Sequence, residues 1–163
     1  MTAAKVEPKV VHATCVVERS FSKPALVVFA ALSDPNKVQR WMGGNARELE
    51  DFLVEFKEGG RQVMQYRMGP QSPIAGSVIL NEGRYQQIVL GERIVIASTM
   101  KRDGKMFSSS LVTFELVETE AGTDLILTHQ GAFFEGADGP AMREQGWRHL
   151  IANLARVVEE DGH

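Results

Sequence analysis

The sequence predicts an α+β domain in which a curved antiparallel sheet wraps around one long C-terminal helix. Three observations support this fold class. First, apolar residues alternate with polar ones through the middle of the chain, which is typical of strands with one buried face. Second, only short turns separate these segments, and strands joined by short turns form an antiparallel sheet. Third, the chain ends in a long amphipathic segment from about Pro140 to Glu159, the only large element of this kind that can cover the sheet.

The N-terminal part of the chain predicts one strand followed by two short helices. Val10–Arg19 is rich in β-branched residues, which favours a strand. Pro24–Leu32 is apolar on almost every side and begins with a proline suited to a first helical turn, so we expect a buried helix. Asp34-Pro35 supplies an N-cap and a first-turn proline for a second helix, which Gly43-Gly44 ends.

The central segments predict a meander of strands. Two alternating segments flank the Gly59-Gly60 turn and predict a hairpin with one apolar face. The apolar positions of this hairpin are Phe52, Val54, Phe56, Met64, Tyr66 and Met68. After a loop with two prolines, four more strands are predicted at Ser77–Val89, Arg93–Lys101, Met106–Glu118 and Thr123–Gly131. The Asp103-Gly104 pair is typical of a two-residue hairpin turn, and Ala121-Gly122 marks another turn.

The C-terminal helix is predicted from its apolar stripe. Arg148, Arg156 and Glu159 fall on the opposite side. The stripe consists of Trp147, Leu150, Ile151, Leu154 and Val158. Gly146 lies inside this helix, where glycine costs about 1 kcal/mol relative to alanine. We expect a close approach of another backbone to offset that cost, and the alternative is a bend that opens a cavity.

Composition limits the domain organisation and the classes of partner. The 163 residues fit one domain, predicted over residues 10–160 after a loose leader of residues 1–9. The net charge of -3 and the scattered Lys and Arg residues argue against nucleic-acid binding. The single cysteine, Cys15, and the lack of an apolar leader or a long apolar run predict a cytoplasmic protein without a membrane span. The sequence contains no metal-site or nucleotide-site motif, so we expect no cofactor.

A series of short phrases runs along residues 12–160 in a particular order and spacing. The phrases are Glu18-Arg19 with Phe21, Leu32-Ser33-Asp34-Pro35 with Arg40-Trp41, Glu58-Gly59-Gly60-Arg61, Gly83-Arg84-Tyr85, Gly91-Glu92-Arg93-Ile94-Val95, Gly122-Thr123 with Leu125-Ile126-Leu127-Thr128-His129, and Glu144-Gln145-Gly146-Trp147 with Leu150 and Leu154. In these phrases the sequence resembles the START-like (SRPBCC) superfamily, and within it the family named after the activator of the heat-shock-protein-90 ATPase. The sequence departs from the usual phrasing at Leu90-Gly91, where a proline pair is more common, and this changes only a turn.

The resemblance implies a helix-grip fold with a cavity between the sheet and the C-terminal helix. It also implies a homodimer, and for many members no known substrate. Related branches bind lipids, sterols or polyketides, and a few catalyse cyclisation or dehydration. Membership of such a superfamily predicts a fold more strongly than an activity.

Aromatic and methionine side chains are the predicted lining of this cavity. Methionine adapts to irregular ligands, whereas Tyr and Trp combine an apolar body with a polar tip. The candidate ligand-binding residues are Trp41, Phe56, Met64, Tyr66, Met68, Tyr85, His129, Phe133, Trp147 and Ile151. Strand and helix geometry places Trp147 and the hairpin residues Phe56, Met64, Tyr66 and Met68 around one apolar cavity. For each residue taken alone, a place in the plain core is the alternative.

Two further residues and one segment are candidates for chemistry or contact. His129 shares a strand face with Leu125 and Leu127, so it points toward the cavity, where an imidazole suits an acid or base. The alternative is a polar side chain satisfied at the end of the sheet. Cys15 is expected to be a small buried hydrophobe rather than a nucleophile. The segment Phe133–Pro140, with two exposed-looking aromatics, suits either a lid or a dimer contact.

Three functions follow from these residues. The leading hypothesis is binding of a small hydrophobic or amphipathic molecule by a homodimer. The second is an enzyme of the cyclase or dehydratase type, with His129 and Tyr66 or Tyr85 as proton-transfer groups. The third is a co-chaperone-like protein-interaction module. A cavity lined only by carbon favours the first, a carboxylate beside His129 favours the second, and a filled core with an apolar outer patch favours the third.

Overall fold

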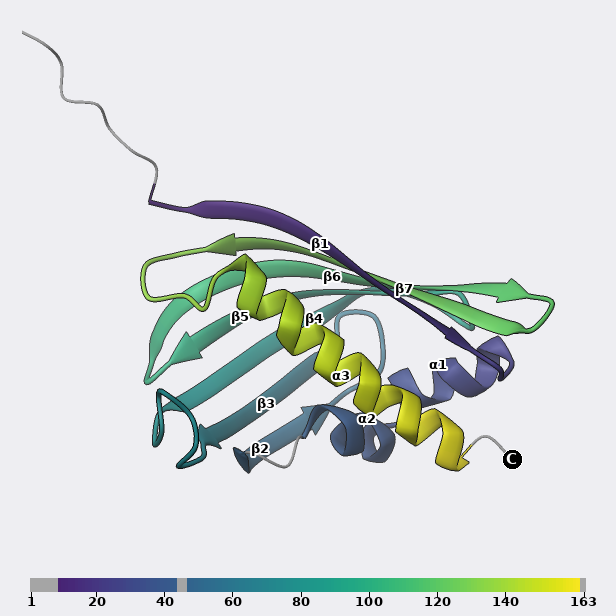
Figure 1. Ribbon diagram of the computed structural model, residues 1–163, viewed down its shortest axis with the longest axis horizontal. Coiled ribbons are helices and arrows are strands. Elements are labelled where there is room, and N and C mark those ends of the chain that lie inside the picture. The colour runs from purple at the N-terminus through teal and green to yellow at the C-terminus, as the bar shows by residue number, and fades with distance from the viewer. Residues whose placement is uncertain (1–8, 44–46, 162–163) are drawn as a thin grey trace, which may run out of the picture.

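One seven-stranded antiparallel sheet forms the outer layer of the protein (Figure 1). The structure is a computed structural model that describes residues 9–43 and 47–161. The strand order is β1-β7-β6-β5-β4-β3-β2, and each neighbouring pair is antiparallel. The strands are β1 (Val11–Phe21), β2 (Arg47–Val54), β3 (Arg61–Met68), β4 (Val78–Val89), β5 (Arg93–Arg102), β6 (Lys105–Thr119) and β7 (Gly122–Phe133). The predicted antiparallel meander is confirmed.

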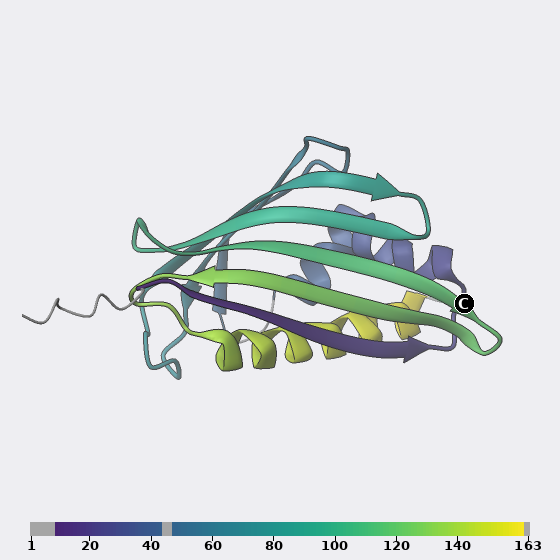
Figure 2. The same cartoon turned by 90° about the horizontal axis from the view of Figure 1, so that it is seen from above.

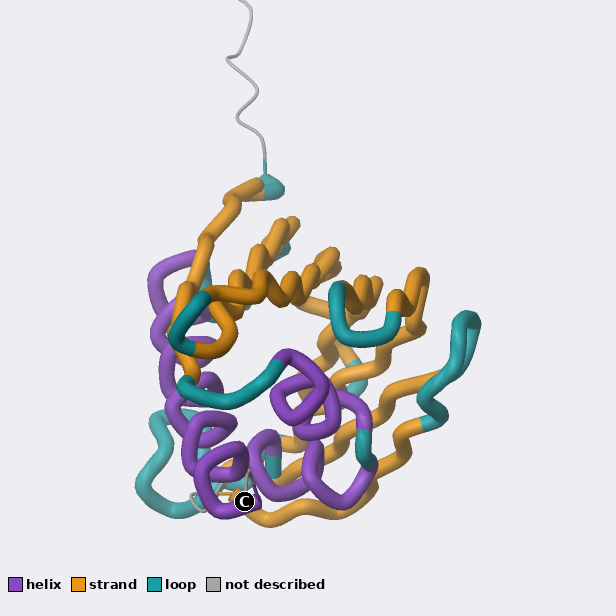
Figure 3. Tube along the Cα trace, turned by 90° about the vertical axis from the view of Figure 1, so that its right-hand side faces the viewer, coloured by secondary structure: helices purple, strands orange, loops and turns teal. Residues whose placement is uncertain are grey.

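Three helices lie on the concave side of the sheet. They are α1 (Ala25–Ser33), α2 (Pro35–Met42) and α3 (Pro140–Asp161). Figures 1 and 2 show α3 running across the sheet, and Figure 3 shows the strands curving around the helices. Most helix contacts of α3 are with α2, and its main sheet contact is with β1. The predicted helix-grip arrangement of two short helices after the first strand and one long C-terminal helix is therefore confirmed.

Local sequence signals explain where the second helix and one hairpin begin. The Asp34 carboxylate accepts hydrogen bonds from the backbone N–H groups of Asn36 (2.9 Å) and Lys37 (3.4 Å), as an N-cap does. The second of the two glycines predicted to end this helix lies outside the described residues. Between β5 and β6, Asp103 and Gly104 both adopt positive φ angles, 49° and 85°, which the predicted two-residue turn requires.

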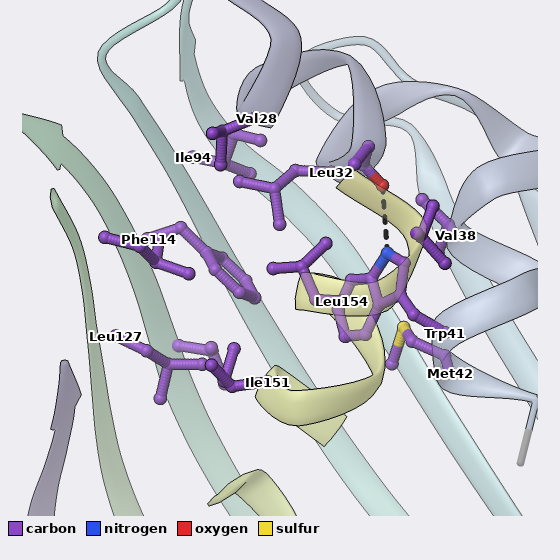
Figure 4. Packing of buried hydrophobic residues seen from close by; sticks show 14 of the residues in the cluster. Val28, Leu32, Val38, Trp41, Met42, Ile94, Phe114, Leu127, Ile151 and Leu154 are labelled. Atoms are coloured by element: carbon purple, nitrogen blue, oxygen red, sulfur yellow. Dashed lines mark hydrogen bonds between the residues drawn. The ribbon is translucent and has the colours of Figure 1, made fainter. Parts of the chain in front are cut away.

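The hydrophobic core fills the end of the molecule where α1 and α2 pack against the sheet. Figure 4 shows Leu32, Trp41 and Leu154 from three helices meeting Phe114 and Leu127 from the sheet. The Trp41 indole is 2% exposed, and its Nε1–H donates to the Ala31 carbonyl at 2.9 Å, which ties α2 to α1.

The placement of Phe56 differs from the prediction. Strand β2 ends at Val54, so Phe56 lies beyond the paired region of the hairpin. Its ring instead makes edge contacts with Phe29 at 5.8 Å and Tyr85 at 5.1 Å between ring centroids. Phe56 therefore packs against the core at the α1 end of the sheet.

No helix in the described part of the chain is both long and apolar enough to span a membrane.

Candidate functional site

A cavity of about 340 Å³ lies between the concave face of the sheet and the N-terminal half of α3. Strands β3 to β7, the end of α2 and the loop before α3 contribute its walls. Its volume falls at the small end of the range for sites that hold small molecules. The cavity and the core therefore occupy opposite ends of the same sheet.

A row of small residues crosses the sheet beside this cavity. Gly83, Ser98, Ser110 and Gly131 are register partners on β4 to β7, and both serines line the cavity. The neighbouring row toward α1 carries larger side chains, which are Tyr85, Ile96, Val112 and His129. A Cβ added at Gly131 would lie only 2.8 Å from a His129 ring atom, so even alanine is too large there.

Methionine dominates the apolar part of the lining. Five of the seven methionines in the chain line the cavity, and they are Met42, Met64, Met68, Met100 and Met142. The thioether side chain is unbranched, flexible and polarisable, so it adjusts to ligands of different shape. These walls can therefore contact apolar molecules of more than one shape.

An ion pair between buried Arg143 and the partly exposed Asp138 forms one polar end of the cavity. Arg143, in the first turns of α3, is 8% exposed. Its Nε and Nη2 each donate to the Asp138 carboxylate at 2.8 Å, and Nη2 also donates to Ser108 Oγ at 2.9 Å. The guanidinium lies 5.0 Å from the centroid of the Phe133 ring. The contacts with Asp138 and Ser108 together engage three of the five N–H donors of a charge that is otherwise costly to bury.

His129 joins this cluster from the sheet. It is 2% exposed, and its Nε2 lies 3.3 Å from Arg143 Nη1. Burial, and then the neighbouring Arg143 charge, lowers the pKa of His129 to about 4. The imidazole is therefore neutral at neutral pH, and its Nε2 accepts the hydrogen bond from Arg143. The His129 ring lies 6.3 Å from the Trp147 ring between centroids.

Five of the ten candidate ligand-binding residues line the cavity. They are Met64, Tyr66, Met68, His129 and Trp147. Period-two alternation on β3 places the first three on one face, and the helical stripe brings Trp147 over them.

The other five candidates do not line the cavity. Trp41, Tyr85 and Ile151 are 2%, 1% and 2% exposed and belong to the core. Phe56 packs against that core, as described above. Phe133 lies beneath Arg143 and is 3% exposed, so the expectation of two exposed aromatics in the segment before α3 is wrong for Phe133.

Sequence reasoning missed Arg143, Asp138 and Ser108. A signal for Arg143 was present, because it lies four residues before Trp147 and therefore extends the apolar stripe of α3 toward its N-terminus. A charged residue on a buried stripe needs a partner. Nothing in the pattern pointed to Asp138 or Ser108 as those partners.

Gly146 corrects another expectation. A Cβ added at this position would meet no atom of another described segment within 4 Å, so none of the described backbone outside α3 approaches it closely. Gly146 lies instead on an exposed part of α3 that borders the cavity.

Cys15 is half-buried and is the register partner of His129 on β1. Burial first, and then the charge of Glu144, raises the pKa of the Cys15 thiol, which favours the protonated form. Within the described residues, no group of three or more His, Cys, Asp and Glu side chains is placed to hold a metal ion.

Comparison with known proteins places this geometry in a family. The family described as "Activator of Hsp90 ATPase homolog 1-like protein" matches residues 22–159. The chain belongs to this family. The family is part of the START-like superfamily, as the sequence phrases indicated. No curated protein matches the chain.

Solved structures share the fold over nearly the whole chain. The Mll3558 protein from Rhizobium loti is 34% identical, with a TM-score of 0.81, and the match covers 91% of this chain and 98% of that one. A putative uncharacterized protein from Rhizobium leguminosarum is 28% identical, with a TM-score of 0.82 and coverage of 93% and 97%. Protein CV1439 from Chromobacterium violaceum is 25% identical, with a TM-score of 0.73 and coverage of 90% and 97%.

Proposed function

We propose that the protein binds a small amphipathic molecule in the cavity between the sheet and α3. The observation that carries this proposal is the division of one cavity into a methionine-rich wall and a polar end built around Arg143 and His129. The flexible apolar walls can pack against the apolar part of such a ligand, and a few fixed polar groups can orient its polar part.

The same geometry gives less support to an enzyme of the cyclase or dehydratase type. The carboxylate nearest to His129 in this cluster, that of Asp138, is engaged by Arg143. A His129 pKa of about 4 makes the imidazole a weak base at neutral pH. Tyr85 lies outside the cavity lining, and burial raises its pKa to about 12, although Gln62 donates to its hydroxyl. Binding therefore accounts for these residues better than proton transfer does.

The interaction-module hypothesis required a filled core, whereas this core leaves a cavity open. A homodimer and a cytoplasmic location remain part of the proposal. The dimer rests on the family resemblance, because members of this family often form homodimers.

Substitution of Met64 by Trp tests the binding proposal. Met64 is buried and lines the cavity, so an indole at this position fills the space that a ligand would occupy. We expect the parent protein to bind the neutral apolar dye Nile red at about one site and the variant Met64→Trp to bind none. The melting temperature should change little, because the new side chain enters empty volume.

Met106→Trp is the matched control. Met106 is 40% exposed and does not line the cavity, so this variant should bind the dye like the parent. A parent protein that binds no dye, together with a Met64→Trp variant destabilised by about 1–3 kcal/mol, would show a close-packed region and end the proposal.

A further inference from the structure

The polar end of the cavity is electrically balanced, and this limits the ligand. Resting on the proposed function, we infer that the ligand is uncharged and presents a neutral oxygen group, such as a hydroxyl, ketone or amide, to the Arg143–His129 end of the cavity. Fatty acid anions and organic cations of the same size are then poor ligands.

The charge argument begins with the Arg143–Asp138 pair. Among the described residues that line the cavity, these are the only Asp, Glu, Lys or Arg side chains. They bind each other through two hydrogen bonds of 2.8 Å, so their charges cancel at short range. A ligand carboxylate near Arg143 would also face Asp138. The attraction of this carboxylate to Arg143 and its repulsion from Asp138 would largely offset each other. The free-energy cost of removing the carboxylate from water would remain.

The neighbouring titratable groups do not alter this balance. His129 faces the pair from β7 and is neutral at neutral pH because of its burial. His149 borders the cavity from an exposed position on α3, in contact with solvent. No second cation is therefore buried at this end within the described residues to hold an anionic head group.

The hydrogen-bonding groups that remain are neutral donors and acceptors. A guanidinium has five N–H groups, and the contacts with Asp138, Ser108 and His129 engage four of them. The fifth, on Nη1, has no acceptor among the described residues. It can therefore donate to an oxygen of the ligand.

The sheet adds a second set of neutral groups close by. Ser110 lies two residues from Ser108 on the same face of β6, and its Oγ is 3.3 Å from Ser98 Oγ. One of these hydroxyls donates to the other, which leaves a second O–H to donate outward. The Asn81 amide also lines the cavity. Such an array binds hydroxyl, ketone and amide groups, which both match its hydrogen bonds and bring no charge.

A series of ligands with one chain length and different head groups tests the inference. Displacement of Nile red from the parent protein would be measured for decanol, decanamide, decanoate and decylammonium. We expect the two neutral compounds to bind at least about tenfold more tightly than either ion, because burial of an unmatched charge is costly. Decanoate or decylammonium binding as tightly as decanol overturns the inference and leaves the binding proposal intact. Failure of all four compounds to displace bound Nile red also overturns the inference, whereas failure of the parent protein to bind Nile red itself overturns the binding proposal.

Asp138→Asn makes the test specific to the ion pair. The Asp138 side chain is 27% exposed, so the substitution leaves Arg143 as an uncompensated cation without opening the core. We expect the preference for decanol over decanoate to fall at least about tenfold, because the repulsive carboxylate is gone. An unchanged preference contradicts the inference.

Glu144→Gln is the matched control for this variant. Glu144 also pairs with an arginine, Arg148, at 3.6 Å, but neither residue lines the cavity. The same carboxylate-to-amide change there should leave the head-group preference unaltered. A shift equal to that of Asp138→Asn would show a general charge effect and contradict the inference. If Asp138→Asn does not fold, the relative affinities of the four ligands for the parent protein decide whether the inference holds.

Discussion

Arg143 and His129 set the chemistry of the cavity at the scale of single residues. Both are buried, and hydrogen bonds make this burial tolerable: Arg143 donates to Asp138, Ser108 and His129, and His129 accepts from Arg143. A lone arginine in that place would carry a large desolvation cost. The network thus joins β7 and the first turns of α3 by polar contacts in a part of the molecule where apolar packing is incomplete.

Burial of His129 predicts a pH-dependent stability. Its folded-state pKa of about 4 lies below its ordinary value of 6.5, so between these values the unfolded chain binds the extra proton. Stability is therefore fully present above about pH 6.5 and is lost as the pH falls toward 4, by up to about 3 kcal/mol. Urea unfolding across this pH range measures the loss.

His129→Gln provides the comparison, because an amide can accept from Arg143 but does not titrate. The difference in unfolding free energy between the parent and this variant should shrink as the pH falls from 6.5 toward 4. A difference that stays constant across the range would assign the acid sensitivity to other groups.

At the scale of elements, α3 performs two tasks along its length. Its C-terminal half carries Leu154 and Val158, which close the core. Its N-terminal half carries Arg143 and Trp147, which line the cavity. Gly146 lies in the N-terminal half of α3, where no other described segment comes within 4 Å of an added Cβ. No packing contact therefore offsets the cost of a glycine inside this helix.

Gly146→Ala is therefore expected to stabilise the protein. Alanine is favoured over glycine inside a helix by about 1 kcal/mol, and the added methyl group meets no atom. The unfolding free energy should rise by roughly that amount in urea titrations. Destabilisation by Gly146→Ala would instead reveal a functional bend in α3.

Gly131→Ala is the contrasting variant within the sheet. Its methyl group would lie 2.8 Å from His129 and 2.9 Å from Phe133, so we expect a loss of about 1–3 kcal/mol.

At the scale of the whole molecule, the sheet is packed at one end and open at the other. Large inward residues such as Phe114 and Leu127 belong to the packed core, whereas Ser98 and Ser110 line the cavity. The curvature visible in Figure 3 lets one sheet serve both purposes. Side-chain size along the strands thus separates the packed end of the sheet from the cavity.

The assembly is also predicted at this scale. We expect a homodimer, because the chain belongs to a family whose members often form homodimers. Light scattering at micromolar concentration should give twice the 18.0 kDa mass of one chain. A mass equal to a single chain would contradict this prediction.

The sequence by itself determined the order and kind of the elements. Alternation on β3, the Asp103-Gly104 turn and the stripe of α3 are local signals, and local geometry turns each of them into a definite face or turn. The same signals correctly placed Met64, Tyr66 and Trp147 on inward faces. The order and spacing of short sequence phrases along residues 12–160 also indicated the family.

The tertiary structure alone decided which inward residues line the cavity and which fill the core. Tyr85 shares the inward side of the sheet with Met64, yet strand register places it in the core row, and Phe56 packs on it from beyond the end of β2. The Arg143–Asp138–Ser108–His129 cluster likewise joins a loop, a helix and two strands that are distant in the chain. Sequence periodicity predicts the face of an element on which a residue lies, but not the residues of other elements that it contacts. The polar end of the cavity could therefore be identified only from the tertiary structure.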